Sequence, residues 1–580
     1  MKDIAYFQLR AHLYPKEHNK YATFTLSELE HVWFCTRKNV KRKIKQLEEE
    51  GRISYAPGQG RGNPSSLHFH EHFQDEVEHF VHQCVQKDQL DHIVKLFQLP
   101  IPKTWIANVS EQVQELFGLQ SSQGNKDTLR TGIARKLSTL DPIYSSVTLE
   151  NHLIDQLSDT LVKYDEDLDE IVPHIAHHWH VDSDHRQWTF YLRKGIRFHH
   201  HKILSSEDVY YTFNRLLECN SPMSWMVQDI QSIKCPTPFK VVITLHDSNP
   251  FFIRYVSSVN LAILPSDTAF DESKWIGTGP FKLIDIDEQK IVLEAFDYYF
   301  LERPLLDRIE FWRVPMGAAK AMSFQIGEGS TNKEQDKYEE IEVGFRFLIF
   351  NFRTPPSPLV HDPLLREAIY HVLDINKMWE DLDREEKLKG QIASSFHPWR
   401  SNAVAKEPNK IHQLLQNSPY KGEELQLYSL NFPQAIEEAQ WFINEAKQYG
   451  IHFNLHTFSL DSLYQENVHQ HADLSFMGEV ASTDIYLSFL GAFYNKALKF
   501  RKLLSDEHLN FIDKKLEDFK HQTTTLAQVS IMEDIEAYLR DHHLVIFQYH
   551  PLKKRAFDPM IRDIRFQSFG YVDFQKLWIP

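Results

Sequence analysis

Residues 25–69 read TLSELEHVWFCTRKNVKRKIKQLEEEGRISYAPGQGRGNPSSLHF. Ser27, with Glu30 three residues later, has the spacing of a capping box and predicts the start of a short helix. A strongly basic helix follows and ends at Gly51, a residue suited to the C-terminal end of a helix. Two strand-like runs then flank a glycine-rich loop. The order is helix, turn, basic helix and hairpin.

Helical spacing divides the basic helix into a buried face and an exposed face. Val40, Ile44 and Leu47 recur at i, i+4 and i+7, so this stripe is expected to pack inward. With strands at 52–55 and 66–69, the pattern is that of a winged helix-turn-helix. A solvated charged helix in a bundle is the other interpretation, and the glycine-rich loop argues against it.

A helix of this kind enters the major groove by its N-terminal end, so its first positions lie nearest the bases. Positions farther along the same face are closer to phosphates, and the loop is placed to contact the backbone or the minor groove. The predicted DNA-binding residues are Thr36, Arg37, Lys38 and Asn39 near the bases, Lys41, Arg42 and Lys45 near the phosphates, and Arg61 in the loop.

Charge is distributed unevenly along the chain. Residues 1–70 hold 12 Lys and Arg and 7 Asp and Glu, a net charge of +5, whereas the whole chain of 580 residues carries -16. The remaining 510 residues therefore sum to -21, and this acidic body repels phosphate. We expect DNA contact to be confined to the basic head. A chain of this length also exceeds one hydrophobic core and predicts two or three domains.

The cysteines and the N-terminus indicate a reducing compartment. The chain's 4 cysteines are scattered, none in a C-x-x-C pair, and make no disulfide framework. The N-terminal segment has no apolar core before a small-residue cleavage site, and no apolar run approaches a membrane span. We therefore expect a cytoplasmic protein that has no membrane partner.

Residues 71–126 form the predicted connector. Apolar residues recur at helical spacing, which indicates one long or two shorter amphipathic helices: Phe73, Val77, Phe80, Val81 and Val85, then Ile93, Leu96 and Phe97. Such helices are suited to pairing in a homodimer or to packing on the head of the same chain. The polar run 121–127, SSQGNKD, marks the boundary of the body, which is expected to span 127–580.

The body carries loose motifs that occur in one order. They are Leu140-Asp141-Pro142, Pro173 to Trp179 before Asp182 to Asp184, FYLRKGIRF at 190–198, Ser206 to Val209, GTGPF at 277–281, and the strand and helix at 349–378. This order resembles the family 5 extracellular solute-binding proteins. With the head attached, the chain resembles the SgrR-type transcriptional regulators. The resemblance implies two α/β lobes that close on a ligand like a hinge, with GTGPF as hinge or turn.

The resemblance also implies a regulator that binds double-stranded DNA under control of a small ligand, a sugar phosphate, a sugar or a peptide. In peptide-binding relatives an Asp in an aromatic segment holds the ligand's amino group, and 474–486 places Glu479 and Asp484 near that position. The FHDG turn of the family is Phe198-His199-His200-His201 here. The predicted ligand-binding residues are Thr139, Tyr144, Trp399, Phe476, Glu479 and Asp484.

Two other functions remain open at this point. A cytosolic oligopeptide- or solute-binding protein of the ABC-transporter type could use its head to contact another protein, although four outward cations favour DNA. A hydrolase could use one of the histidine clusters, 177–180 or 199–201. Adjacent strand residues point to opposite faces, so neither cluster predicts a metal site. No catalytic motif is present, and we expect no enzyme activity and no cofactor.

Overall fold

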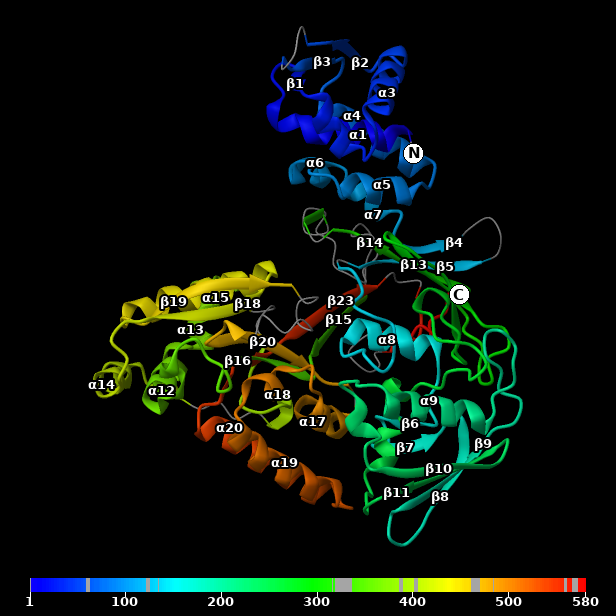
Figure 1. The fold of residues 1–580 in the computed structure, drawn as a ribbon, viewed down its shortest axis with the longest axis vertical. Coiled ribbons are helices and arrows are strands. Elements are labelled where there is room, and N and C mark those ends of the chain that lie inside the picture. The colour runs from blue at the N-terminus through cyan, green and yellow to red at the C-terminus, as the bar shows by residue number, and fades with distance from the viewer. Residues whose placement is uncertain are drawn as a thin grey trace.

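The computed structural model describes residues 2–58, 63–121, 126–133, 135–315, 317–318, 336–384, 390–400, 405–459, 470–482, 484–557, 561–565 and 572–580. Arg61, one of the predicted DNA-binding residues, lies outside these ranges. The chain forms a head, a connector and two lobes, and the head projects from one end of the body (Figure 1). Within the described ranges, no helix is both long and apolar enough to cross a membrane.

The head, residues 2–70, has the predicted helix, turn, basic helix and hairpin, with one further helix and strand before them. Its elements are α1 (Lys2–Leu13), β1 (Tyr21–Phe24), α2 (Leu26–Val32), α3 (Arg37–Glu49), β2 (Ile53–Ala56) and β3 (Ser65–Phe69). The strands form an antiparallel sheet in the order β1-β3-β2. Helix α3 buries Val40, Ile44 and Leu47, which confirms the inward stripe. Gly51 follows the helix with a φ of +72°, a conformation that glycine adopts at little cost.

The capping box at the start of α2 involves a different pair from the predicted one. Thr25 is the N-cap, and its side chain accepts from the backbone N–H of Glu28. The Glu28 carboxylate in turn accepts from the Thr25 N–H. The prediction of Ser27 and Glu30 was wrong by two residues, because both pairs share the same spacing. Strand β1 ends at Phe24, so the chain is already extended at Thr25 and turns into the helix there.

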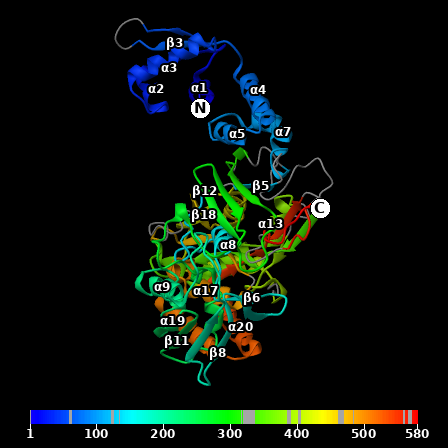
Figure 2. The ribbon, with the colours of Figure 1, turned by 90° about the vertical axis from the view of Figure 1, so that its right-hand side faces the viewer.

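The connector, residues 71–117, packs with the head in a single core. Its helices are α4 (Phe73–Gln86), α5 (Leu90–Phe97), α6 (Lys103–Asn108) and α7 (Ser110–Gln114). The apolar residues at helical spacing therefore lie on two shorter helices, α4 and α5, and not on one long helix. Buried side chains of these helices and of the head belong to one hydrophobic cluster, which also contains Trp312 and Val314 of the body. In the second view the helices run from the head down to the body (Figure 2).

Lobe I comprises residues 118–315 and the C-terminal residues 561–580. Its strands are β4 (Gly118–Ser121), β5 (Asp127–Ile133), β6 (Val162–Asp165), β7 (Glu170–Pro173), β8 (Ala176–Val181), β9 (Gln187–Leu192), β10 (Ile230–Thr237), β11 (Lys240–Leu245), β12 (Phe281–Ile286), β13 (Lys290–Ala295) and β14 (Arg308–Arg313). Its helices are α8 (Thr148–Leu157), α9 (Ser206–Glu218) and α10 (Phe252–Tyr255). One sheet has the order β12-β13-β14-β5-β4 and another the order β10-β11-β9-β8. Because β4 pairs with β5, the body sheet begins at Gly118, before the end of the polar run 121–127 that the sequence predicts as the boundary.

Lobe II comprises residues 344–550 and is built on a sheet of order β19-β18-β20-β16-β21. Its strands are β16 (Gly344–Phe350), β17 (Gln391–Ile392), β18 (Glu424–Leu430), β19 (His452–Phe458), β20 (Leu474–Val480), β21 (Val545–Phe547) and β22 (Tyr549–His550). Its helices are α12 (Pro363–Val372), α13 (Ile375–Asp381), α14 (Ile411–Asn417), α15 (Pro433–Gln448), α17 (Ile485–Tyr494), α18 (Lys499–Leu503), α19 (Asp506–Lys520) and α20 (Thr525–Asp541). The antiparallel pair β15 (Asp336–Ile341) and β23 (Leu552–Phe557) runs along the two connections between the lobes. The two-lobed α/β architecture matches the prediction.

The GTGPF segment acts by close approach to the backbone of α8. A Cβ atom at Gly277 would lie 2.1 Å from the Leu157 carbonyl oxygen, and one at Gly279 would lie 2.5 Å from the Leu157 carbonyl carbon. Neither glycine has a positive φ. The structure thus shows a packing role, in which only glycine leaves room for the end of α8, and the role in a hinge or turn stays a prediction.

Candidate DNA-reading helix and ligand cleft

The exposed face of α3 carries the cations that the sequence predicted. Arg37, Lys38, Lys41 and Arg42 are exposed, and no ion pair joins any of them to another described residue. Lys45, one turn farther along, is exposed and lies 3.6 Å from the Glu49 carboxylate. An exposed pair at this distance holds its charges only weakly. The face therefore presents its positive charge to solvent.

The N-terminal end of α3 has the features of a phosphate-binding helix end. Thr36 occupies the N-cap position, but its side chain makes no capping hydrogen bond, and the first turn of α3 contains no acidic residue. The unbonded N–H groups and the positive end of the helix dipole remain available to an anion. Asn39 is half-buried in the same turn. Thr36 to Asn39 thus lie together at one end, with Lys41, Arg42 and Lys45 along the helix.

Helix α1 contacts the turn that leads into α3, and the sequence reasoning did not identify this support. The Trp33 indole, just before α3, donates to the Ala5 carbonyl at 2.8 Å. Arg10 of α1 is fully buried and pairs with Glu17 at 2.9 Å and with Glu76 of α4 at 2.6 Å. These contacts tie the head to the connector. The local signal in the sequence is an arginine, Arg10, among apolar residues, with the acidic Glu17 seven positions later.

A cleft between the two lobes encloses a cavity of about 360 Å³. Glu479 and Asp484, both predicted ligand residues, line it from lobe II. Among the described lining residues, carboxylates outnumber cations seven to two: Asp155, Asp165, Glu166, Asp167, Glu479, Asp484 and Asp573 against Lys163 and Arg565. The cavity is therefore suited to a ligand that carries a positive group.

The two acidic candidates have different surroundings. The Glu479 side chain is partly buried on β20, and no hydrogen bond or ion pair joins its carboxylate to another described residue. Burial raises the pKa of Glu479 to about 8. Asp484 caps α17 and lies 2.9 Å from the Arg254 guanidinium of lobe I. Burial raises the pKa of Asp484 as well, and Arg254 opposes that shift. Glu479 therefore offers a ligand a carboxyl group that has no partner among the described residues.

Contacts across the cleft show that the lobes are closed. Besides the Arg254–Asp484 pair, the rings of Trp225 and Tyr494 stack with centroids 5.4 Å apart. The Lys520 ammonium of lobe II lies 3.1 Å from Asp229 of lobe I. One hydrophobic cluster extends through both lobes. A ligand that binds between the lobes would add to contacts that already favour closure.

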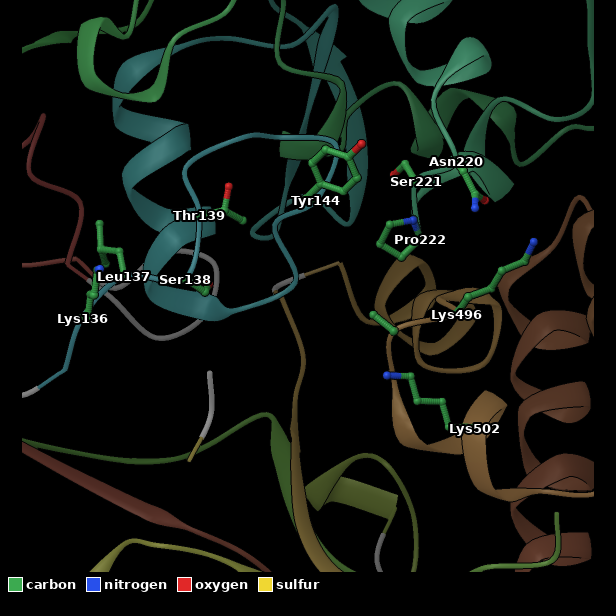
Figure 3. Close-up of a pocket in the computed structure, with 11 residues that line it drawn as sticks. Lys136, Leu137, Ser138, Thr139, Tyr144, Asn220, Ser221, Pro222, Lys496 and Lys502 are labelled. Carbon is green, nitrogen blue, oxygen red and sulfur yellow. The ribbon is translucent and has the colours of Figure 1, made fainter. Parts of the chain in front are cut away.

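A second cavity of about 720 Å³ adjoins this cleft and is lined from both lobes (Figure 3). Thr139 and Tyr144, also predicted ligand residues, line it from lobe I. Its described lining includes Lys136, Lys496 and Lys502 and no carboxylate. In the close-up the Lys502 ammonium extends into the space between the lobes. This cavity is suited to an anionic group.

The structure does not bring the other two candidates to either cavity. The Trp399 side chain is 62% exposed and stacks on the His397 ring. Phe476 is buried on β20 and meets the Phe442 ring edge to face, as part of the core of lobe II. Neither residue lines the cleft or the adjoining cavity. The sequence reasoning missed Trp225, which lines the cleft from lobe I.

Two clusters of histidines stand out in the sequence and raise the question of a metal centre. Among the residues whose positions are described, no three His, Cys, Asp or Glu side chains form a group that could hold a metal ion. His199 accepts from the Gly277 N–H at Nδ1 and donates from Nε2 to the Gly279 carbonyl. Burial lowers the pKa of His199 to about 4, so its ring is neutral. His201 takes a φ of +71° at the position of the family's glycine.

Both the N-terminal part and the body of the chain match known protein families. Residues 4–120 match the domain described as the sugar transport-related sRNA regulator N-terminal domain, and residues 170–499 match the bacterial extracellular solute-binding proteins, family 5. The chain is 26% identical to the uncharacterised protein YhjP of Bacillus subtilis over 97% of both chains. It is 25% identical to the HTH-type transcriptional regulator SgrR of Yersinia enterocolitica, over 96% of this chain and 95% of that one.

Among solved structures, the oligopeptide-binding protein AppA of Bacillus subtilis, in complex with a nonapeptide, has the same fold as the body. The two share a TM-score of 0.67 at 18% identity, over 78% of this chain and 99% of AppA. The fold of the body, the order of the two matched domains and the full-length relatives all indicate the same family. The chain belongs to the family 5 bacterial solute-binding proteins and carries the N-terminal domain of the SgrR-type regulators in front of that fold.

Proposed function

We propose that this protein is a transcription regulator that binds double-stranded DNA through its head and a small ligand between its lobes. The exposed cationic face of α3, at the end of the molecule remote from the cleft, is the observation that carries the proposal. The full-length relatives named as transcriptional regulators support it. The acidic body favours DNA contact through the head alone.

The head is attached to lobe I by contacts suited to transmitting a change. The Arg130 guanidinium on β5 makes two hydrogen bonds, of 2.5 and 3.0 Å, to the Asp88 carboxylate in the α4–α5 turn. Its Nε also donates to Glu310 on β14 at 3.1 Å. Trp312 and Val314 belong to the core of the head and connector. Head and lobe I would therefore move together when lobe II opens or closes.

The two cavities favour a ligand that carries both charges. An ammonium group fits beside Glu479, and an anionic group fits among Lys136, Lys496 and Lys502. A peptide has this pattern, and so does a phosphorylated amino sugar. A neutral sugar carries neither an ammonium nor an anionic group. Of the three ligand classes predicted, a neutral sugar is thus the least suited.

DNA binding tests the proposal directly. Duplexes selected from a random library by the full-length protein would be titrated with wild type and with Lys41→Ala/Arg42→Ala. We expect the variant to bind every duplex more weakly, with a salt dependence shallower by about two units. Lys447→Ala/Lys514→Ala removes the same charge from exposed positions of lobe II and should bind as wild type. Failure of wild type to select any duplex would instead favour a head that contacts another protein.

A further inference from the structure

Phe34 lies at the tip of the turn between α2 and α3 with almost its whole ring in water. Its side chain is 95% exposed, against 56% for Tyr21, the next most exposed large apolar side chain described in the head. Its neighbours are Trp33, which is buried against α1, and Cys35, which is half-buried. The two side chains that flank Phe34 thus turn inward. A phenyl ring at this position adds nothing to the core of the head.

The backbone at Phe34 is also in an unfavourable conformation. Its φ is +45°, in the left-handed region that glycine adopts freely and that an L-residue enters at a cost. Asn or Asp at such a position can form a local hydrogen bond, and phenylalanine has no polar group to do so. Residues held in this region without a packing reason are typical of functional positions. Glycine would suit the turn better, so the ring has another use.

The surroundings of Phe34 identify what the ring would meet. It is two residues before Thr36, the N-cap of α3, and three before Arg37. This is the end of the helix where the N–H groups are uncapped and the cations are exposed. A polyanion that binds this end would cover the ring as well. In the major groove the apolar group available to a phenyl ring is the C5 methyl of thymine.

We propose that Phe34 contacts a thymine methyl group of the bound duplex and contributes to sequence preference next to the base-reading end of α3. The proposal rests on the proposed DNA-binding function. A protein partner is the other occupant that could cover an exposed ring. The positive charge around it, in a chain that is otherwise acidic, favours DNA.

The test uses the full-length protein and a duplex that it selects from a random library. Each thymine of the site is replaced in turn by deoxyuracil, which removes only the methyl group. For wild type we expect one position to weaken binding about fourfold, the effect of losing one buried methyl group. Phe34→Ala should bind the unmodified duplex about fourfold more weakly and should no longer respond to uracil at that position. Tyr21→Ala, which removes another exposed aromatic ring of the head, should behave as wild type.

Phe34→Gly separates the two properties of the residue. Because glycine accepts the positive φ, this variant should unfold at a higher temperature than wild type while losing the same fourfold affinity. An unchanged affinity of Phe34→Ala and Phe34→Gly would overturn the proposal, as would a variant that still responds to uracil as wild type does. If wild type selects no duplex at all, the proposed function fails. If it selects one and Phe34→Ala binds it equally well, only the thymine contact fails.

Discussion

Replacing Glu479 by glutamine should remove a pH dependence from the stability of the closed body. Glu479 lies in the cleft with a pKa raised to about 8 by burial, and its carboxylate has no described partner. The folded, closed form therefore favours the protonated acid. Stability from this group is fully present below the ordinary pKa of 4.5 and is lost as the pH rises through 8. Glutamine resembles the protonated acid and does not titrate.

The size of the effect follows from the shift. One pKa unit corresponds to about 1.4 kcal/mol, so the full shift from 4.5 to about 8 sets an upper limit of about 5 kcal/mol. The side chain is partly exposed, and solvent screening reduces this to about 2 kcal/mol. We therefore expect Glu479→Gln to match wild type at pH 4 and to be more stable by about 2 kcal/mol at pH 9.

Thermal unfolding of the full-length protein, followed by calorimetry from pH 4 to pH 9, measures the difference. The control is Glu288→Gln, in the exposed turn between β12 and β13, which should keep the wild-type pH profile. Parallel profiles for wild type and Glu479→Gln would show that Glu479 is ionised in the closed form, and the reasoning would fail. An ammonium ligand that pairs with Glu479 should also release protons on binding at a pH where this acid is still protonated, detectable as a buffer-dependent heat.

Three further predictions concern the head, its attachment and lobe I. Arg37→Ala should relax sequence preference by about 1–3 kcal/mol at one base pair, whereas Lys45→Ala should weaken binding to all duplexes alike, as mobility-shift titrations would show; intact preference in Arg37→Ala would contradict the placement of α3. Asp88→Asn should cost less than about 1 kcal/mol of stability because Asp88 is 58% exposed, yet it should speed proteolysis between head and lobe I. Gly279→Ala should lower the melting temperature of lobe I, since the added Cβ would lie 2.5 Å from the backbone of α8, at a cost of about 1–3 kcal/mol; an unchanged melting temperature would refute the packing role.

The sequence predicted those parts of the fold that rest on local periodicity. The stripe of Val40, Ile44 and Leu47 predicted the buried face of α3. The two lobes of the body came from its resemblance to the family 5 solute-binding proteins. The capping pair was wrong because Thr25–Glu28 and Ser27–Glu30 have the same spacing. Only the end of β1 selects between them.

Features that depend on distant partners were missed. Arg10 is held by Glu76, 66 residues away, and this pairing has no signature in sequence. The basic cavity joins Lys136 with Lys496 and Lys502, which come from different lobes. Trp399 was chosen for its residue type, and the structure exposes it outside both cavities. Residue type alone cannot tell which aromatic side chain faces a cleft.

The central claim is that a ligand between the lobes changes the affinity of the head for DNA. The most direct measurement is the titration of a selected duplex with full-length protein, with and without a saturating ligand found by thermal-shift screening. We expect the two dissociation constants to differ by about 5- to 150-fold, the range of a coupling of about 1 to 3 kcal/mol. Asp88→Asn should still bind the duplex and the ligand, but its DNA dissociation constants with and without ligand should differ less than those of wild type. Identical constants in wild type, despite saturating ligand, would contradict the claim.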